Sequence, residues 1–136
     1  MSSITDPVST SPESTIEDAP LTFGKITLHS RMIVGTGKYP SFEVMRAAHE
    51  ASASQMVTVA LRRVDLANPA NNILNFIDTK RMMILPNTAG CYTAEDALRT
   101  LRLARELGGW TLVKLEVLGD AKTLYPDMEE TLRAAK

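Results

Sequence analysis

Hydrophobic residues gather in four short runs along this chain, and stretches with a different pattern separate them. The runs cover residues 32–34, 56–61, 82–85 and 111–118. Short apolar runs that are bounded by Gly, Pro, Asn or charged residues predict β-strands. Because these runs alternate only weakly between apolar and polar positions, we expect strands that are covered on both faces, as in a parallel sheet.

Apolar residues at helical spacing follow the strands. Each of these segments begins with a residue type that is favoured before a helix, and the third one ends at a pair of glycines. The expected starting points are Ser41, Asn68-Pro69, Thr93 and Asp127, the last of which precedes a helix over residues 128–136.

Strands that alternate with helices predict a parallel sheet with right-handed crossovers. We therefore expect residues 21–136 to form one α/β domain, a parallel-strand (β/α) unit of about four βα repeats. Residues 21–28 alternate around Gly24 and Lys25, which indicates a short hairpin or cap strand before the first repeat.

Residues 1–20 differ from the rest of the chain. They are rich in Ser, Thr and Pro, carry four acidic residues and have no Lys or Arg. Such a segment buries too little apolar surface to offset the entropy lost on ordering. We interpret it as a disordered leader; it lacks the basic start and apolar middle of a signal peptide.

Composition excludes several classes of function. A net charge of -1 and a pI near 6.1 offer no electrostatic footprint for nucleic acid or an anionic membrane. The single cysteine, Cys91, excludes an internal disulfide framework and a multi-cysteine metal site. No apolar run reaches the length of a membrane span. We expect a cytoplasmic protein of 136 residues with no metal and no membrane partner.

The fourth apolar run contains two charged residues, Lys114 and Glu116. On a strand they share one face, about 6.6 Å apart along the chain. Desolvation favours the neutral, nucleophilic form of a lysine, and a neighbouring carboxylate can move protons. A Schiff-base lysine with an acid/base partner therefore fits this pattern, although an ion pair on a half-exposed strand has the same sequence.

Other candidate binding residues lie where the predicted strands end, and the carboxyl ends of parallel strands meet at one edge of the sheet. Gly35 and Gly37 form a turn or a backbone lining for substrate; Pro40 and Met32 exclude a dinucleotide fingerprint and a P-loop. The remaining candidates follow the next two strands: Arg62 and Arg63 for an anionic group, Asn87 and Thr88 as hydrogen-bonding groups or as turn residues.

Taken together, these segments resemble the thiazole synthase (ThiG) family of bacterial thiamin biosynthesis. The resemblance extends from about residue 21 to the end. It is carried by residues 30–42, Val59-Ala60-Leu61-Arg62-Arg63, Leu85-Pro86-Asn87-Thr88-Ala89-Gly90, Thr93-Ala94-Glu95, Val113-Lys114-Leu115-Glu116-Val117 and residues 122–127.

The resemblance implies a reaction and its partners. Lys114 would form an imine with the ketone of 1-deoxy-D-xylulose 5-phosphate, and Glu116 would move protons in the tautomerisation that follows. Sulfur would arrive as a thiocarboxylate on the C-terminal Gly-Gly of a small sulfur carrier protein. Dehydroglycine would complete the thiazole ring, with no metal or tightly bound organic cofactor.

Length sets the chain apart from that family, whose fold is a TIM barrel of roughly 250 residues and eight strands. We expect the N-terminal half of such a barrel, without the phosphate site of its last strands, inactive alone and prone to homo-oligomerise through its open edges. Two alternatives remain open: a non-catalytic half-barrel that binds the sulfur carrier, and another Schiff-base barrel of the aldolase kind.

Overall fold

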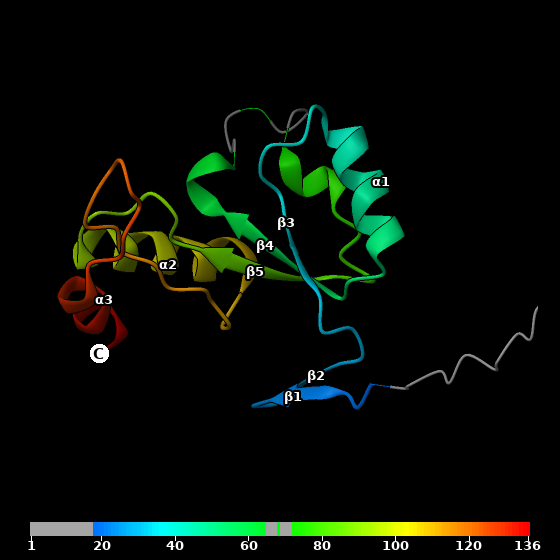
Figure 1. The fold of residues 1–136 in the computed structure, drawn as a ribbon, viewed down its shortest axis with the longest axis horizontal. Coiled ribbons are helices and arrows are strands. Elements are labelled where there is room, and N and C mark those ends of the chain that lie inside the picture. Colours follow the sequence, from blue (N-terminus) through cyan, green and yellow to red (C-terminus); the bar gives the residue numbers. More distant parts are fainter. Residues whose placement is uncertain (1–17, 65–67, 69–71) are drawn as a thin grey trace, which may run out of the picture.

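The computed structural model describes residues 18–64, 68 and 72–136. A three-stranded parallel sheet forms its centre, in the order β3 (Ile33–Gly35), β4 (Met56–Ala60) and β5 (Met83–Asn87). An antiparallel hairpin of β1 (Leu21–Phe23) and β2 (Ile26–Leu28) lies below the sheet (Figure 1). The parallel α/β class and the hairpin are confirmed, and the described strands do not close into a barrel.

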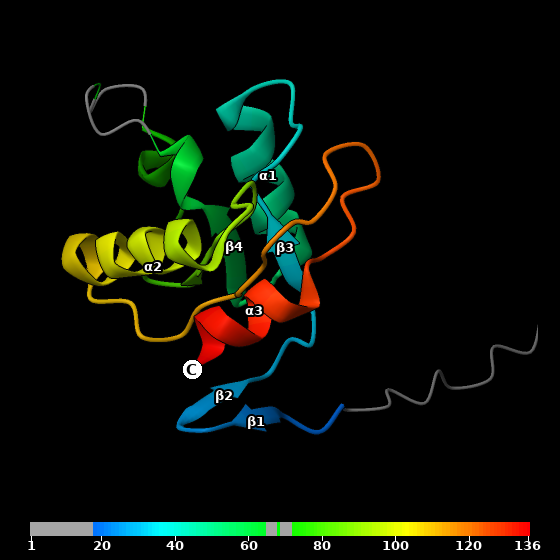
Figure 2. The same ribbon diagram turned by 90° about the vertical axis from the view of Figure 1, so that its left-hand side faces the viewer.

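Three helices follow the strands: α1 (Phe42–Ser52), α2 (Ala94–Gly108) and α3 (Met128–Ala135). The expected N-caps are confirmed, because Ser41, Thr93 and Asp127 each accept a hydrogen bond from a backbone N–H of the first turn. Gly109 ends α2 in the left-handed conformation that glycine favours. Helix α3 packs against α2 through Ala134, Ala94 and Ala97, and Figure 2 shows both helices nearer the viewer than α1.

The two faces of the sheet have different coverings. On the outer face, Val57 and Val59 pack against Met45 of α1, and all three are at most 1% exposed. Because side chains alternate along a strand, Ile33 and Met56 lie on the inner face, together with the inward-facing residues of β5. The hairpin covers part of this face through a second cluster, made of Phe23, Ile26, Leu28, Met56, Leu85 and Leu112.

Strand β5 runs further than the sequence predicted. Pro86 was expected to end it, yet Pro86 and Asn87 both pair in register with β4. The carbonyl of Pro86 accepts a hydrogen bond from the Lys114 backbone N–H at 2.8 Å, on the side away from β4. A proline is tolerated in this position because its missing N–H removes no bond from the ladder with β4.

The predicted fourth strand over residues 111–118 is not formed as a strand. Only one parallel bridge joins it to the sheet, between Asn87 and Lys114. The Thr88 N–H still donates to the Lys114 carbonyl at 3.3 Å, but the next backbone groups, those of Glu116, bond the Thr88 hydroxyl instead of a main chain. Among the described residues, none forms a β-bridge with residues 112–116 on their other edge, so backbone pairing holds this part of the chain from one side only.

Two further predictions meet the limits of the description. The helix expected from Asn68-Pro69 appears only as a short 3-10 turn, Ile73–Phe76, and residues 69–71 lie outside the described part. Most of the expected leader, residues 1–17, lies outside it as well. Within the described ranges, no helix combines the length and apolar character needed to span a membrane.

Candidate active site

Lys114 and Glu116 lie next to each other beyond the end of β5. The Lys114 Nζ is 4.0 Å from the Glu116 Oε2, so both side chains project to the same side of the segment. The Lys114 side chain is 51% exposed and that of Glu116 is 32% exposed. In this chain the pair is therefore in reach of solvent, which screens the charges and lowers the value of the ion pair.

Thr88 fixes the backbone of Glu116. Its hydroxyl donates to the Glu116 carbonyl and accepts from the Glu116 N–H, with both oxygen-to-partner distances at 2.7 Å. The residue is fully buried. The Thr88 hydroxyl thus takes the place of a strand partner, and it positions the carboxylate of Glu116 through the main chain.

Asn87 connects this segment to the neighbouring strand. Its Nδ2 donates to the Thr58 Oγ1 at 2.7 Å, and its Oδ1 accepts from the Ala89 N–H at 3.1 Å. The sequence analysis missed Thr58, although it is the one hydroxyl residue in an otherwise apolar β4. Thr58 and Asn87 share the inner face with Lys114, so this side of the sheet carries the polar groups.

The two arginines lie in one 3-10 turn, Leu61–Arg63, directly after β4, and they reach the loops after the two neighbouring strands. The Arg62 guanidinium donates to the Gly90 carbonyl, which ties the end of β4 to the loop after β5. The Arg63 Nη1 lies beside Gly37, where a Cβ on the glycine would approach it to 3.3 Å. Among the described residues, no carboxylate comes within ion-pair distance of either guanidinium.

The glycine loop after β3 completes this end of the sheet. Gly35 is the last residue of β3, and an added Cβ there would meet the Thr58 side chain at 3.8 Å. Lys38, in the same loop, has a φ of 67°, a conformation that costs energy for a residue with a side chain. The predicted site residues therefore lie at or after the carboxyl ends of β3, β4 and β5, or on the segment beside them.

The arrangement offers an amine, a carboxylate and two guanidinium groups at one edge, and among the described residues neither guanidinium is ion-paired. Guanidinium groups suit phosphate and carboxylate ligands, and an amine next to a carboxylate suits imine chemistry with a proton partner. Among the described residues, no cluster of His, Cys, Asp and Glu is arranged to hold a metal ion.

Comparison with known proteins identifies relatives of this chain among the thiazole synthases. The chain is 58% identical over 122 residues to thiazole synthase of Myxococcus xanthus, and 63% identical over 111 residues to that of Novosphingobium aromaticivorans. These matches take in 89% and 81% of this chain but only 47% and 43% of the relatives. The chain thus spans about half the length of the curated relatives that it matches.

A solved structure has the same fold. The Amycolatopsis orientalis BexX/CysO complex matches with a TM-score of 0.67 and 26% identity, over 87% of this chain and 49% of the matched chain. Residues 22–136 match the family described as thiazole biosynthesis protein ThiG. The chain therefore belongs to the ThiG family of thiazole synthases, and it corresponds to the N-terminal part of its members.

Proposed function

We propose that this chain carries the imine-forming lysine of a thiazole synthase. Lys114 attacks the ketone carbon of 1-deoxy-D-xylulose 5-phosphate, and water leaves as the C=N bond forms. Glu116 then accepts a proton from the carbon next to the imine and returns it during tautomerisation. Sulfur from a carrier thiocarboxylate and dehydroglycine complete the ring.

The observation that carries this proposal is the 4.0 Å separation of the Lys114 Nζ and the Glu116 Oε2 at the carboxyl ends of the strands. A proton partner must lie within reach of the reacting atoms, and a substrate that joins Lys114 lies within reach of Glu116. The nearby Arg62 and Arg63 groups provide positive charge for anionic parts of the substrates.

Carrier binding is the second part of the proposal. The family resemblance implies a sulfur carrier protein, and the matched BexX structure is that of a BexX/CysO complex. The part of the chain that resembles it includes the loops after β3, β4 and β5, so a docking surface within this half of the fold is consistent with the match.

The exposure of Lys114 is unfavourable for catalysis by this chain alone. An amine needs partial desolvation to be neutral and nucleophilic, and the side chain of Lys114 is 51% exposed. We therefore propose that the 136-residue chain alone turns over little or no substrate. The alternative is a carrier-binding role without catalysis, which would survive Lys114→Ala.

Trapping with borohydride tests the imine. The chain, and a chimera that extends it with the C-terminal half of the Myxococcus xanthus relative, are incubated with 1-deoxy-D-xylulose 5-phosphate, reduced, and mapped by mass spectrometry. We expect a reduced adduct on Lys114 in the chimera, stronger than in the short chain, and none on the exposed Lys122. A chimera without a Lys114 adduct, or with equal labelling of Lys122, contradicts the proposal.

A further inference from the structure

The turn that follows β5 carries the segment of Lys114. The Lys114 N–H donates to the Pro86 carbonyl at 2.8 Å, and the Thr88 N–H donates to the Lys114 carbonyl at 3.3 Å. The Thr88 hydroxyl then bonds both backbone groups of Glu116 at 2.7 Å. Within the part of the chain that the structure describes, no residue forms a β-bridge with the other edge of this segment. Backbone pairing therefore places Lys114 and Glu116 only through this turn.

The side chain of Asn87 shapes the turn. Its Oδ1 accepts a hydrogen bond from the Ala89 N–H at 3.1 Å, the local contact by which an asparagine closes a turn two residues further on. Because a backbone N–H can only donate, this contact assigns the oxygen of the amide to the turn and leaves the Nδ2 to bond elsewhere. Asn87 is 5% exposed, so an Nδ2 group without a partner would be costly.

Thr58, on the neighbouring β4, is the partner of that Nδ2 group. Its Oγ1 accepts from the Asn87 Nδ2 at 2.7 Å. Its methyl group lies on the other side, toward β3, where a Cβ on Gly35 would meet it at 3.8 Å. The hydroxyl is therefore turned toward β5. Since Thr58 is the one residue of β4 with a hydroxyl group, no other side chain of this strand can replace it.

We propose that Thr58 is a positioning residue for the pair of Lys114 and Glu116, and this role rests on the function proposed above. Thr58 holds the Asn87 amide, and Asn87 shapes the turn. The Thr88 hydroxyl in that turn then holds the backbone of Glu116. The hydrogen bonds of this series measure 2.7 to 3.1 Å, and beyond them the Lys114 Nζ lies 4.0 Å from the Glu116 Oε2. Thr58 thus acts by keeping the carboxylate within reach of the carbon next to the imine.

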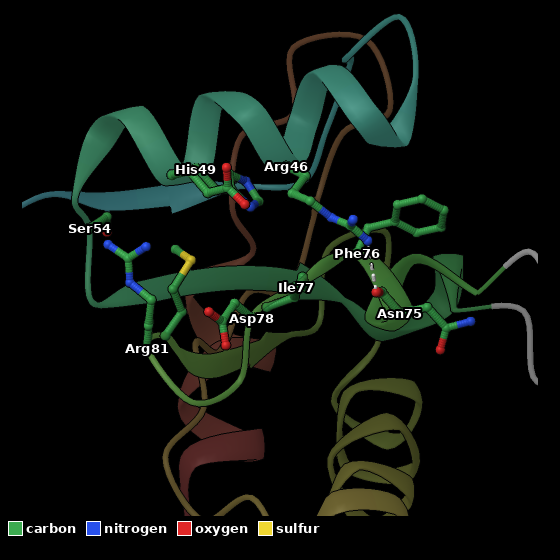
Figure 3. A pocket seen from close by; sticks show the side chains of 10 residues that line it. Arg46, His49, Ser54, Asn75, Phe76, Ile77, Asp78 and Arg81 are labelled. Atoms are coloured by element: carbon green, nitrogen blue, oxygen red, sulfur yellow. Dashed lines mark hydrogen bonds between the residues drawn. The ribbon is translucent and has the colours of Figure 1, made fainter.

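The Thr58 side chain acts on the inner face of the sheet and points away from the core beneath α1. On that outer face, the His49 Nε2–H donates to the Gly35 carbonyl at 2.9 Å. There α1 borders a cavity of about 280 Å³, whose lining residues take no part in the Thr58 contacts (Figure 3). Loss of the Thr58 hydroxyl should therefore loosen the turn and the segment of Glu116, while the outer core keeps its packing.

Hydrogen exchange in the 136-residue chain tests the structural part of this role. Thr58→Val keeps the shape of the side chain and removes the acceptor, so the Glu116 amide should exchange about tenfold faster relative to the amides of α1. Thr58→Ser, which retains the hydroxyl, should restore the parental rate. Thr131→Val removes a hydroxyl that bonds the Asp127 carbonyl at the start of α3, and this matched control should leave the rate unchanged. A parental rate at Glu116 in Thr58→Val overturns the proposal.

Proton transfer in the chimera tests the chemical part. In deuterated water, Thr58→Val should slow deuterium uptake at the carbon next to the ketone about tenfold, while the trapped Lys114 adduct falls less than about twofold. Thr58→Ser should restore the uptake. Equal losses of uptake and adduct, or no loss of uptake, overturn the positioning role alone, whereas a parent chimera without the adduct contradicts the proposed function.

A thermal melt checks that Thr58→Val folds. If it does not, Thr58→Cys decides by the same two measurements, because its thiol is a weak acceptor of similar size.

Discussion

The two faces of the three-stranded sheet have the same strands and opposite surroundings. On the outer face, Met45, Val57 and Val59 are almost completely buried. On the inner face, Ile33 is 46% exposed and Met83 is 38% exposed, and the polar Thr58, Asn87 and Lys114 lie beside them. The outer face stabilises the sheet, whereas the inner face holds the candidate chemistry. A change of the same kind should therefore have unequal effects on the two faces.

The largest difference should appear on truncating one methionine from each face. Met45→Ala removes a fully buried side chain from the outer core and should cost about 2–5 kcal/mol of unfolding free energy. Met83→Ala should cost about 1 kcal/mol or less, because its side chain is partly in solvent already. Urea denaturation of both variants measures this, and equal losses would show that the inner face is packed as tightly as the outer one.

Thr88→Val tests the link between the inner face and Glu116. The substitution keeps the shape of the side chain but leaves the Glu116 N–H and carbonyl without their partner, at a cost of about 2–3 kcal/mol. Hydrogen exchange at the Glu116 amide should become faster. Thr22→Val, at an exposed threonine, is the control; unchanged exchange in Thr88→Val would mean that the segment is held by other contacts.

Self-association should depend on the inner face. We expect the chain to form oligomers through its exposed apolar side, and Ile33→Lys should raise the dissociation constant about tenfold, or about 1.4 kcal/mol. Val44→Lys alters a residue of similar exposure, 48%, on α1 and serves as the control. Analytical ultracentrifugation compares them. A monomeric parent, or equal effects of both variants, contradicts this prediction.

The smallest effect concerns the loop that follows the Lys114 segment. Hydrogen bonds from the Thr123 side chain and N–H, and from the Lys122 N–H, hold the pKa of Asp120 below its usual range. Because the pKa of Asp120 is lower in the folded state than in the unfolded state, its ionised carboxylate contributes to stability at neutral pH. This contribution is lost as the pH falls through the folded pKa. NMR titration should show the lowered pKa of Asp120. The Asp120→Asn variant should lose the pH dependence of stability that this carboxylate causes.

Local patterns in the sequence were sufficient to predict α1, α2, α3 and the three paired parallel strands, but not the state of residues 111–118, whose apolar run predicted a fourth strand that forms only isolated bridges. Ser41, Thr93 and Asp127 act on the first turn that follows them, so their role is readable from neighbouring residues. The short apolar runs were likewise enough for the three strands of the sheet. The predicted end of β5 was wrong, because a strand tolerates Pro86 only when the proline nitrogen faces away from the paired strand, and the sequence does not show which way it faces.

The sequence predicted that the candidate site residues lie at the ends of the strands, but it did not reveal their contacts. Thr88 was expected to bind substrate, whereas its hydroxyl is engaged with Glu116. The partnership of Thr58 and Asn87 joins residues 29 positions apart, which no local pattern reveals. His49 was interpreted as structural or exposed, because a single histidine without a companion at metal-ligand spacing carries no signal of its own.

The β1–β2 hairpin gives the sheet a closed end and an open end. It packs beneath the inner face against Met56 and Leu85, at the end where the chain enters (Figure 1). A group joined directly before Leu21 therefore attaches at the end of the sheet opposite the carboxyl ends of the strands, where the candidate site residues lie. The hairpin side is therefore a suitable attachment site: surface capture, labels or solubility partners placed there should leave the approach to Lys114 open.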